Sequence, residues 1–475
     1  MKIIVIFIAH KYNKNSSPPL NLDSIPGTIR KPINFLNVLI RFIESMISDL
    51  KQTLGTNGKD ENPNSFIFRV TEKVKVKEIA LRHTSIRLKK LIKSLKIKGE
   101  KLEQTRRLVL VATFATLVST YEDGFRVIIE VLNDVPNYKL VCTDAAIAIR
   151  PIFEKFKTTV ITSGTLSPFE MYKDLLDFDP GVAAQIQSTY SRSNIKATIT
   201  TRGNDQVNLT SKFDSRTDPA VVRNYGLLLV ELSKVIPDGM VAFFSSYSHL
   251  EYCCEQWYQA DGGGKRILES LEEQKLIFVE ISGSNEDDIR NLMTSYKLAC
   301  QSGRGAILLA VARGRVSEGL DFANHLARCV VVLGMPFTNT QSLTTKVRLK
   351  WLREVLKINE TDWLLFDACR HATQCLGRSV RGKQDYSLMV LADKRFQRAD
   401  RINKMPYWLV NKLDQGSRDL TIEETCNAGR IHMRNMGEDD GIVFEMGLGV
   451  SILSENYFYE REDLVEKCMD TAVDV

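Results

Sequence analysis

Short apolar segments alternate with longer amphipathic segments in the second half of this chain, and this alternation restricts the fold more than any other feature. The apolar runs that predict strands are "MVAFFSS", "KLIFVEI", "GAILLAVA", "RCVVVLG" and "YSLMVLAD". Between them, residues 247–260, 287–303, 344–359 and 363–381 have the apolar spacing of helices. Near-continuous apolar strands joined by amphipathic helices are typical of a mostly parallel sheet covered on both faces. The sequence therefore predicts an α/β fold.

Small and polar residues directly follow several of the apolar runs. Ligands of open α/β sheets bind beyond the carboxyl ends of the strands, so we expect a site at these positions. The candidates are Ser163, Gly164 and Thr165 after "TTVIT"; Ser245, Ser246 and Tyr247 after "MVAFF"; and Arg313, Glu318, Gly319 and Asp321 in "ARGRVSEGLDF". Each group alone is ordinary loop chemistry, and only their order along the chain makes them informative.

The segment "QCLGRSVRGKQDYS" carries a further set of candidates. Gln374, Arg378 and Arg381 stand at i, i+4 and i+7, and on a helix they share one face. Such a face is either solvated or binds an anion. Phosphoryl transfer requires fixed positive charge around the γ-phosphate, and guanidinium groups supply that charge with directional donors. We therefore expect Arg378 and Arg381 to act as arginine fingers.

Several segments together resemble the XPD family of superfamily 2 DNA helicases. "QCLGRSVRGKQDYSLMVLADKRF" resembles the family's motif VI, "ARGRVSEGLDF" motif V, "VAFFSSYSHLE" motif IV and "VITSGTLSP" motif III. "LVATFATLVSTYEDGF", "RGNDQV", "TSKFDSR" and "FDACRHATQCLGR" are also similar, and the resemblance runs from about Pro26 to the C-terminus. Ser387 stands where the family usually has Gly, and Arg315 where it usually has Lys; neither change removes a chemical role.

The resemblance implies an ATP-dependent helicase that moves 5′ to 3′ on single-stranded DNA. It implies a nuclear subunit of the transcription factor TFIIH, acting in transcription and nucleotide excision repair, with ATP and Mg²⁺ as cofactors. By position, Arg378 and Arg381 reach the γ-phosphate with Gln374 close by. Glu318, Gly319 and Asp321 link the nucleotide to the DNA path, Ser163 to Thr165 couple hydrolysis to movement, and Ser245, Ser246, Tyr247 and Arg313 are candidates for DNA contacts.

The motifs that hold the nucleotide and the cluster in this family are not found in the sequence. Family members carry a Walker A loop, an Asp-Glu-Ala-His box for Mg²⁺ and four cysteines that bind a [4Fe–4S] cluster. The segments "GTNGKD" and "GGGKR" lack the Ser or Thr that binds Mg²⁺, and we interpret both as loops. "VIFIAH" retains Phe7, Ala9 and His10 of an apolar strand followed by such a box, without its acidic pair. We expect no metal ligands and no iron–sulfur cluster.

The resemblance also predicts a domain order within a RecA-like P-loop NTPase fold. Residues 1–25 are interpreted as a remnant of the magnesium-box strand and a linker, and residues 26–105 as the helical, basic end of the arch domain. Residues 106–168 correspond to the C-terminal part of the first motor domain, which like the arch domain is only partial. Residues 169–475 form a nearly complete second motor domain.

Composition restricts the class of protein but not its activity. The 475 residues are 44% hydrophobic, enough for more than one core, and the net charge of +6 permits a polyanionic partner without requiring one. The nine cysteines follow no metal-binding or disulfide spacing and are expected to be free thiols. The run "MKIIVIFIAH" is too short to span a bilayer and is expected to form a strand, so no membrane partner is expected.

Three interpretations remain open from the sequence. The first is a truncated helicase that is inactive alone, because the arginines have no bound nucleotide in front of them. The second is a non-catalytic module that binds DNA or TFIIH subunits. The third is an incomplete gene model of a normal helicase.

Overall fold

The computed structural model describes residues 32–53, 58–75, 78–94, 100–132, 135–184, 194–259, 265–382 and 385–437. The chain forms two compact units. Unit 1 comprises residues 1–161, 170–181 and 339–360, and unit 2 comprises residues 162–169, 182–338 and 361–475. The expected strand at "MKIIVIFIAH" and the linker after it lie outside the described residues.

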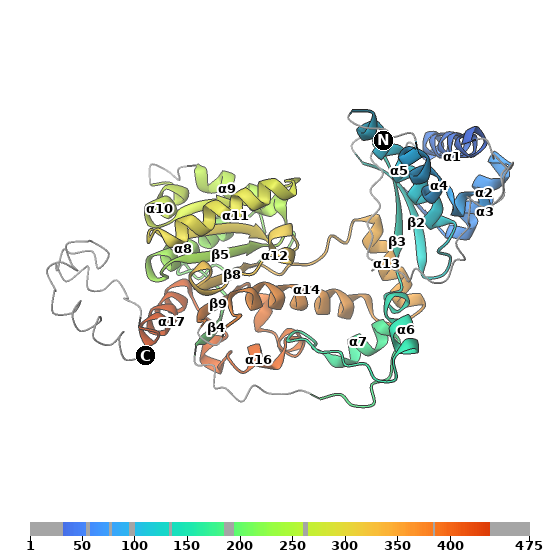
Figure 1. Cartoon of the computed structure of the whole chain (residues 1–475). Coiled ribbons are helices and arrows are strands. Elements are labelled where there is room, and N and C mark those ends of the chain that lie inside the picture. The colour runs from blue at the N-terminus through green and yellow to red at the C-terminus, as the bar shows by residue number, and fades with distance from the viewer. Residues whose placement is uncertain are drawn as a thin grey trace, which may run out of the picture. The chain divides into compact units, whose positions relative to one another are not determined.

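Unit 2 is built on a six-stranded sheet in which every neighbouring pair is parallel. The strand order is β4-β9-β8-β5-β7-β6, and Figure 1 labels β4, β9, β8 and β5 of this sheet. The strands are β4 (Ile195–Thr200), β5 (Gly239–Phe244), β6 (Leu276–Val279), β7 (Ala306–Val311), β8 (Cys329–Leu333) and β9 (Ser387–Ala392). All residues of β5, β7, β8 and β9 are buried, as their continuous apolar sequences predict. The predicted α/β fold with a parallel sheet is confirmed.

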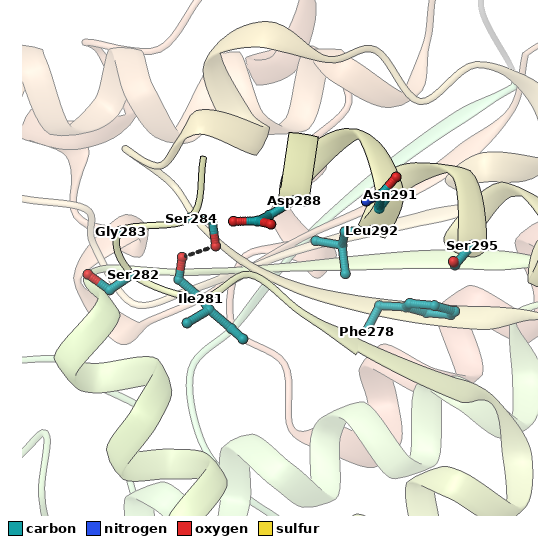
Figure 2. Close-up of a pocket in the computed structure, with 9 residues that line it drawn as sticks. All are labelled: Phe278, Ile281, Ser282, Gly283, Ser284, Asp288, Asn291, Leu292 and Ser295. Atoms are coloured by element: carbon teal, nitrogen blue, oxygen red, sulfur yellow. Dashed lines mark hydrogen bonds between the residues drawn. The ribbon is translucent and has the colours of Figure 1, made fainter. Parts of the chain in front are cut away.

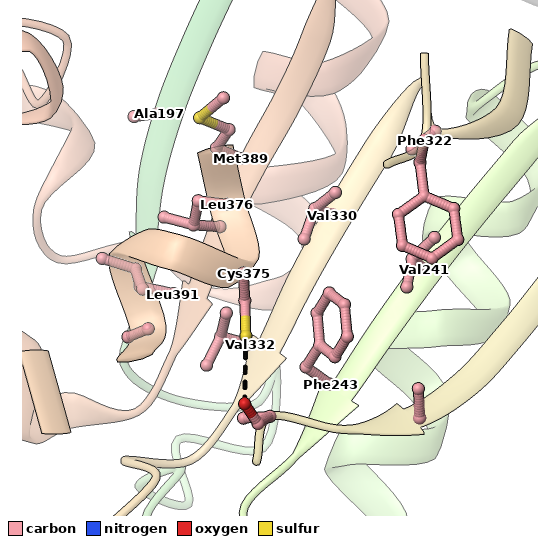
Figure 3. Packing of buried hydrophobic residues seen from close by; sticks show 14 of the residues in the cluster. Ala197, Val241, Phe243, Phe322, Val330, Val332, Cys375, Leu376, Met389 and Leu391 are labelled. Atoms are coloured by element: carbon pink, nitrogen blue, oxygen red, sulfur yellow. Dashed lines mark hydrogen bonds between the residues drawn. The ribbon is translucent and has the colours of Figure 1, made fainter. Parts of the chain in front are cut away.

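Helices cover both faces of this sheet. One face packs on α8 (Pro219–Val235), α9 (Tyr247–Tyr258), α10 (Ile267–Gln274) and α17 (Ile422–Asn435). The other face packs on α11 (Glu286–Gln301) and α14 (Glu360–Leu376). Figure 3 shows the core on the face covered by α11 and α14, where Cys375 and Leu376 of α14 lie against Val332 and Leu391. The Cys375 thiol donates to the carbonyl of Ala312 (3.7 Å).

Local sequence signals fix where several of these helices begin. The Asp218 carboxylate accepts the amide of Ala220 (2.9 Å) at the start of α8, and Pro219 occupies the first turn. Asn285 and Asp288 form a reciprocal capping box at the start of α11. Gly303 follows the end of α11 with a φ of +78°, a left-handed conformation that glycine adopts without strain.

The helix predicted to run through residue 381 ends five residues earlier. α14 stops at Leu376, residues 377–379 form one 3₁₀ turn, and Val380 is extended. Gln374, Arg378 and Arg381 therefore do not share one helical face, and that prediction is wrong. The helix stops here because the chain must reverse direction to enter β9, which runs parallel to its neighbours.

The remaining short elements of unit 2 surround the sheet. They are α12 (Arg315–Gly319), η1 (Asn324–Leu326), η2 (Gly377–Ser379), η3 (Lys394–Gln397), α15 (Ala399–Ile402), α16 (Tyr407–Val410) and η4 (Gln415–Ser417). The segment "TTVIT" before Ser163, interpreted as a strand, has no strand partner and runs as an irregular segment.

Unit 1 combines helices with a three-stranded antiparallel sheet in the order β1-β2-β3. The strands are β1 (Lys59–Glu61), β2 (Phe125–Leu132) and β3 (Val135–Cys142). The helices are α1 (Pro32–Thr53), α2 (Pro63–Val74), α3 (Glu78–Arg82), α4 (Thr84–Ser94), α5 (Glu100–Val118), α6 (Ala146–Lys155), α7 (Phe169–Leu176) and α13 (Leu343–Glu354). The domain boundaries proposed from the sequence stay predictions.

The apolar run "RLVLVATFATLV" belongs to helix α5, although it is rich in β-branched residues. Val111, Phe114, Ala115 and Val118 are buried at helical spacing against the core of unit 1. Tertiary packing of this stripe outweighs the strand propensity of valine and threonine.

Candidate functional site

Arg378 and Arg381 converge on the carboxylate of Asp321. Arg378 Nη1 donates to Asp321 Oδ1 (3.1 Å) and to the carbonyl of Leu320 (3.2 Å). Arg381 Nη2 donates to the same Oδ1. We call these three residues the arginine cluster. Two guanidinium groups thus donate to one carboxylate oxygen. Guanidinium groups placed in this way can also donate to the oxygen atoms of a bound anion.

The backbone around the arginine cluster is held by Asp385. This carboxylate is buried and accepts the amides of Arg381 (2.7 Å) and Gly382 (2.6 Å) on one oxygen and that of Asn324 (3.1 Å) on the other. Burial by itself raises the pKa of Asp385, but the three amide hydrogen bonds outweigh burial and lower it. Asp385 stays charged near neutral pH and fixes the turn that carries Arg381.

The arginine cluster is formed by the segment between β7 and β8, which carries Asp321, and the segment between α14 and β9, which carries both arginines. Asp385 precedes β9 by two residues and Asn324 precedes β8, while the amide of Arg328 bonds the carbonyl of Gly239 at the start of β5 (2.9 Å). Asp385 and Asn324 therefore lie near the amino-terminal edge of the sheet, whereas Cys375, in the last turn of α14, contacts the carbonyl of Ala312 directly beyond the carboxyl end of β7. The expected position of the arginines relative to the strand ends stays a prediction.

The two arginines control the charge of Asp321. Burial works to raise the pKa of this carboxyl, but hydrogen bonds from Arg381 and Arg378, together with their charges, lower the pKa below its ordinary value. Asp321 and Arg381 are about half exposed, whereas Arg378 is mostly buried. The cluster is open to solvent on the side of Arg381.

The remaining residues expected near the arginines flank the cluster along the chain. Glu318 and Gly319 end α12, and the Glu318 side chain is outside the described part of the chain. Gly319 is exposed, and a methyl group there would meet no atom within 4 Å. Gln374 is half-buried in the last turn of α14.

Ser245, Ser246 and Tyr247 lie at the carboxyl-terminal edge of the sheet, after β5 and at the start of α9. Ser246 caps the helix by accepting the amide of His249 (3.2 Å), and the Ser245 hydroxyl lies 3.2 Å from His249 Nδ1. Burial, followed by the positive charge of Arg216, lowers the pKa of His249 to about 4, so this ring is neutral near pH 7. The serines therefore build the entry to α9.

Arg313 is held by groups within unit 2. Its guanidinium donates to the carbonyl of Pro336 (2.8 and 3.0 Å) and to Asp367 of α14 (2.7 Å). Burial opposes ionisation of Asp367, but the hydrogen bond from His371 and the charges of Arg313 and Arg370 lower its pKa. Arg313 thereby joins the segment after β7 to α14, and its expected DNA contact stays a prediction.

Ser163, Gly164 and Thr165 form a small turn that contacts α16. The hydroxyls of Ser163 and Thr165 lie 3.1 Å apart, and the Trp408 indole donates to the carbonyl of Gly164 (2.8 Å). Ser167 reaches the carbonyl of Met405 (3.3 Å).

Two buried carboxylates at the carboxyl edge were missed by reasoning from the sequence. Glu280, directly after β6, bonds Tyr247 and the segment after β7. Asp393, directly after β9, bonds Arg395 Nη2 (2.7 Å) and the amide of Ser211 (2.9 Å). An acidic residue that follows an apolar strand is a signal that could have identified both.

An open cavity of about 640 Å³ lies between the segment after β6 and helix α11. Figure 2 shows its lining, in which the Ser284 hydroxyl donates to the carbonyl of Ile281 (2.8 Å). None of the candidates from the sequence lines this cavity, although Arg315 of α12 donates to the carbonyl of Ser284 (2.7 Å).

Within the described ranges, no group of three or more His, Cys, Asp or Glu side chains is arranged to hold a metal ion. The eight cysteines in those ranges are free. Of the helices in the described part of the chain, none has the length and apolarity to span a membrane.

Two protein-family models match the chain. Residues 229–412 match the helicase C-terminal domain, and residues 16–124 match the helical and beta-bridge domain. The first match contains Tyr247, Asp321, Arg378 and Arg381.

Curated relatives align with most of the chain. The general transcription and DNA repair factor IIH helicase subunit XPD of Dictyostelium discoideum is 40% identical over 422 residues, which cover 88% of this chain and 53% of the relative. The subunit of the same name from Schizosaccharomyces pombe is 41% identical over 422 residues, with the same coverage. The chain spans about half the length of these relatives.

Solved structures show the same fold. Structures described as XPD_APO and XPD_Helicase each match with a TM-score of 0.51 and cover 82% of this chain. The matched regions make up 72% and 64% of the chains of these two structures, at 16% and 15% sequence identity.

Proposed function

Since the chain belongs to the XPD family of helicase subunits, we propose that it supplies the second motor domain of a DNA-dependent ATPase that moves 5′ to 3′ on single-stranded DNA. Arg378 and Arg381 stabilise the γ-phosphate in the transition state, with Gln374 close by. Glu318, Gly319 and Asp321 connect the nucleotide to the DNA path. The turn at Ser163, Gly164 and Thr165 couples hydrolysis to movement, and Ser245, Ser246, Tyr247 and Arg313 face the DNA strand.

The convergence of two guanidinium groups on Asp321 is the observation that carries this proposal. Phosphoryl transfer depends on positioned positive charge more than on covalent chemistry. The Asp321 carboxylate offers the arginines an anionic oxygen acceptor, as a phosphate does. Asp385 accepts the backbone amides of Arg381 and Gly382, so the backbone that carries this guanidinium is held by hydrogen bonds.

We propose further that the 475-residue chain does not hydrolyse ATP alone. The arginines are present, but neither "GTNGKD" nor "GGGKR" supplies a Walker A loop. In this proposal the arginines act on a nucleotide whose phosphates and Mg²⁺ are bound by another domain. No [4Fe–4S] cluster is expected in this chain.

The partners in this proposal are single-stranded DNA and other TFIIH subunits, in the nucleus. The names of the two relatives, which place those proteins in factor IIH, support this part of the proposal.

A domain exchange tests the proposal directly. Residues 162–475 of this chain would replace the corresponding segment of the Dictyostelium discoideum relative, and ATP hydrolysis would be measured with single-stranded DNA. We expect the exchanged protein to hydrolyse ATP, and Arg381→Ala to lower kcat by at least about 10³-fold without loss of fold. Arg290→Ala, an exposed arginine of α11, is the matched control.

The 475-residue chain would be assayed beside it and is expected to stay at background. Robust DNA-stimulated turnover by the chain alone would contradict its proposed inactivity. An exchanged protein that folds and binds DNA, yet keeps most of its turnover with Arg381→Ala, would remove Arg381 from the proposed role. If it folds but never hydrolyses ATP, a non-catalytic DNA-binding or TFIIH-binding module becomes the better description.

A further inference from the structure

Glu280 is a buried carboxylate that connects three segments of unit 2. It directly follows strand β6 and is only 2% exposed. Its Oε1 accepts the Tyr247 hydroxyl at the start of α9 (2.8 Å) and the amide of Val316 in α12 (3.3 Å). Its Oε2 accepts the amide of Val311 at the end of β7 (2.9 Å).

The segment between β7 and α12 is shaped around this carboxylate. A Cβ atom at Gly314 would lie 2.6 Å from both carboxylate oxygens, so only glycine permits the approach. On the other side, Arg315 Nη1 donates to the carbonyl of Ser284, in the segment that follows Glu280 (2.7 Å). Two hydrogen bonds therefore connect the start of α12 to the segment between β6 and α11: the Val316 amide donates to Glu280, and Arg315 donates to the carbonyl of Ser284.

The bond to Tyr247 persists over the neutral pH range. Burial, followed by the hydrogen bond to Glu280 and the charge of that residue, raises the pKa of Tyr247 to about 12. The phenol therefore remains a donor. A buried carboxylate without hydrogen-bond donors is unfavourable. Conformations that keep the bonds from Tyr247, Val311 and Val316 to Glu280 are therefore favoured over conformations that break them.

We propose that Glu280 is a positioning residue that sets the placement of α12 relative to the start of α9. Through Val311 and Val316 it fixes the segment that leads to Glu318, Gly319 and Asp321, and through Tyr247 it fixes the candidate DNA-binding residues Ser245 and Ser246. This inference rests on the proposed function, because it assigns Glu280 a role in joining the DNA contacts to the arginine cluster.

Amide hydrogen exchange on the full chain tests the geometry without DNA or nucleotide. Glu280→Gln keeps the side-chain shape but replaces one acceptor oxygen with an NH₂ group, which cannot accept from Val311, Val316 or Tyr247. We expect exchange to rise about tenfold or more in peptides that cover 311–319 and 247–250, because the loss of one charged acceptor costs over 1.4 kcal/mol. Glu286→Gln, the same change at an exposed position of α11, should leave these peptides unaltered.

Tyr247→Phe provides a second variant in case Glu280→Gln does not fold. It removes one donor and keeps the ring, so we expect a smaller rise in exchange in peptides that cover 311–319. If neither variant changes exchange in this segment, Glu280 does not position it and the inference is overturned.

A double-mutant cycle on DNA affinity separates positioning from general stability. We expect each single variant to weaken binding of an oligothymidine strand about fivefold to tenfold, and the double variant to be no weaker than the worse single, because both break the same connection. If the two fold-changes in DNA affinity multiply in the double variant, the two residues act independently. If the loss of affinity only parallels a lower thermal midpoint of unfolding, the effect is merely structural. If the wild-type chain binds no DNA, the proposed function fails, while the exchange experiment still decides the geometry.

Discussion

At Asp321, one carboxylate oxygen accepts hydrogen bonds from two arginines that lie 57 and 60 positions later in the chain. The carboxylate neutralises part of the positive charge that we propose acts on phosphate. An incoming anion must compete with Asp321 for the same donors. The negative charge of this residue therefore weakens anion binding to the chain alone.

Asp321→Asn should strengthen the binding of pyrophosphate to the 475-residue chain about fivefold at low salt, because exposed ion pairs contribute up to about 1 kcal/mol. Isothermal titration calorimetry measures this affinity. Asp287→Asn removes a similarly paired carboxylate of α11 that is far more exposed, and should change nothing. Unchanged or weaker binding in Asp321→Asn would mean that the carboxylate does not compete with phosphate.

At the scale of elements, the turn between α14 and β9 positions Arg381. Its conformation depends on Asp385, which accepts two amides of the turn and the amide of Asn324, the first residue of η1. This turn replaces the longer helix that the spacing of Gln374, Arg378 and Arg381 predicts. A single buried acceptor therefore decides where the second arginine points.

Asp385→Ala should lower the free energy of opening this region by about 2–4 kcal/mol, because three partly buried amide hydrogen bonds to a charged acceptor are lost. Amide exchange in peptides covering 321–326 and 380–387 measures the change. Asp385→Asn retains one carbonyl oxygen and should show a smaller loss, and the exposed Asp287→Ala should show none. Equal stability of all three variants would remove Asp385 from this role.

At the scale of the whole molecule, charge predicts how the chain meets DNA. The net charge of +6 is modest, so affinity for a single strand depends on local contacts between arginine or lysine and phosphate. Such contacts release counterions and read no base sequence.

Binding of an oligothymidine strand to the chain should weaken steeply between about 50 and 200 mM salt, with little preference among sequences of equal length. Fluorescence anisotropy over a salt series measures the slope, and oligocytidine and mixed strands serve as comparisons. Affinity that ignores salt, or that depends strongly on sequence, would contradict an electrostatic contact with the backbone.

The sequence by itself determined the α/β class, five of the six strands of unit 2 and the beginnings of several helices. These features depend on neighbours in the chain: continuous apolar runs form buried parallel strands, and Asn285 and Asp288 cap α11 locally. The motif resemblance likewise depends only on the order of residues. It identified the family and selected Asp321, Arg378 and Arg381.

Only the tertiary structure decided that Arg378 and Arg381 share the carboxylate of Asp321, and which buried carboxylates support the segments around them. Asp385, Glu280 and Asp393 act through partners 31 to 182 positions away as well as through close neighbours, and such contacts exist only after the sheet has formed. For the same reason, α5 is a helix although its residues favour strands: its buried stripe packs against the core of unit 1. Local preference sets most of the elements, whereas long-range burial decides exceptions such as α5 and the positions of the buried charged groups.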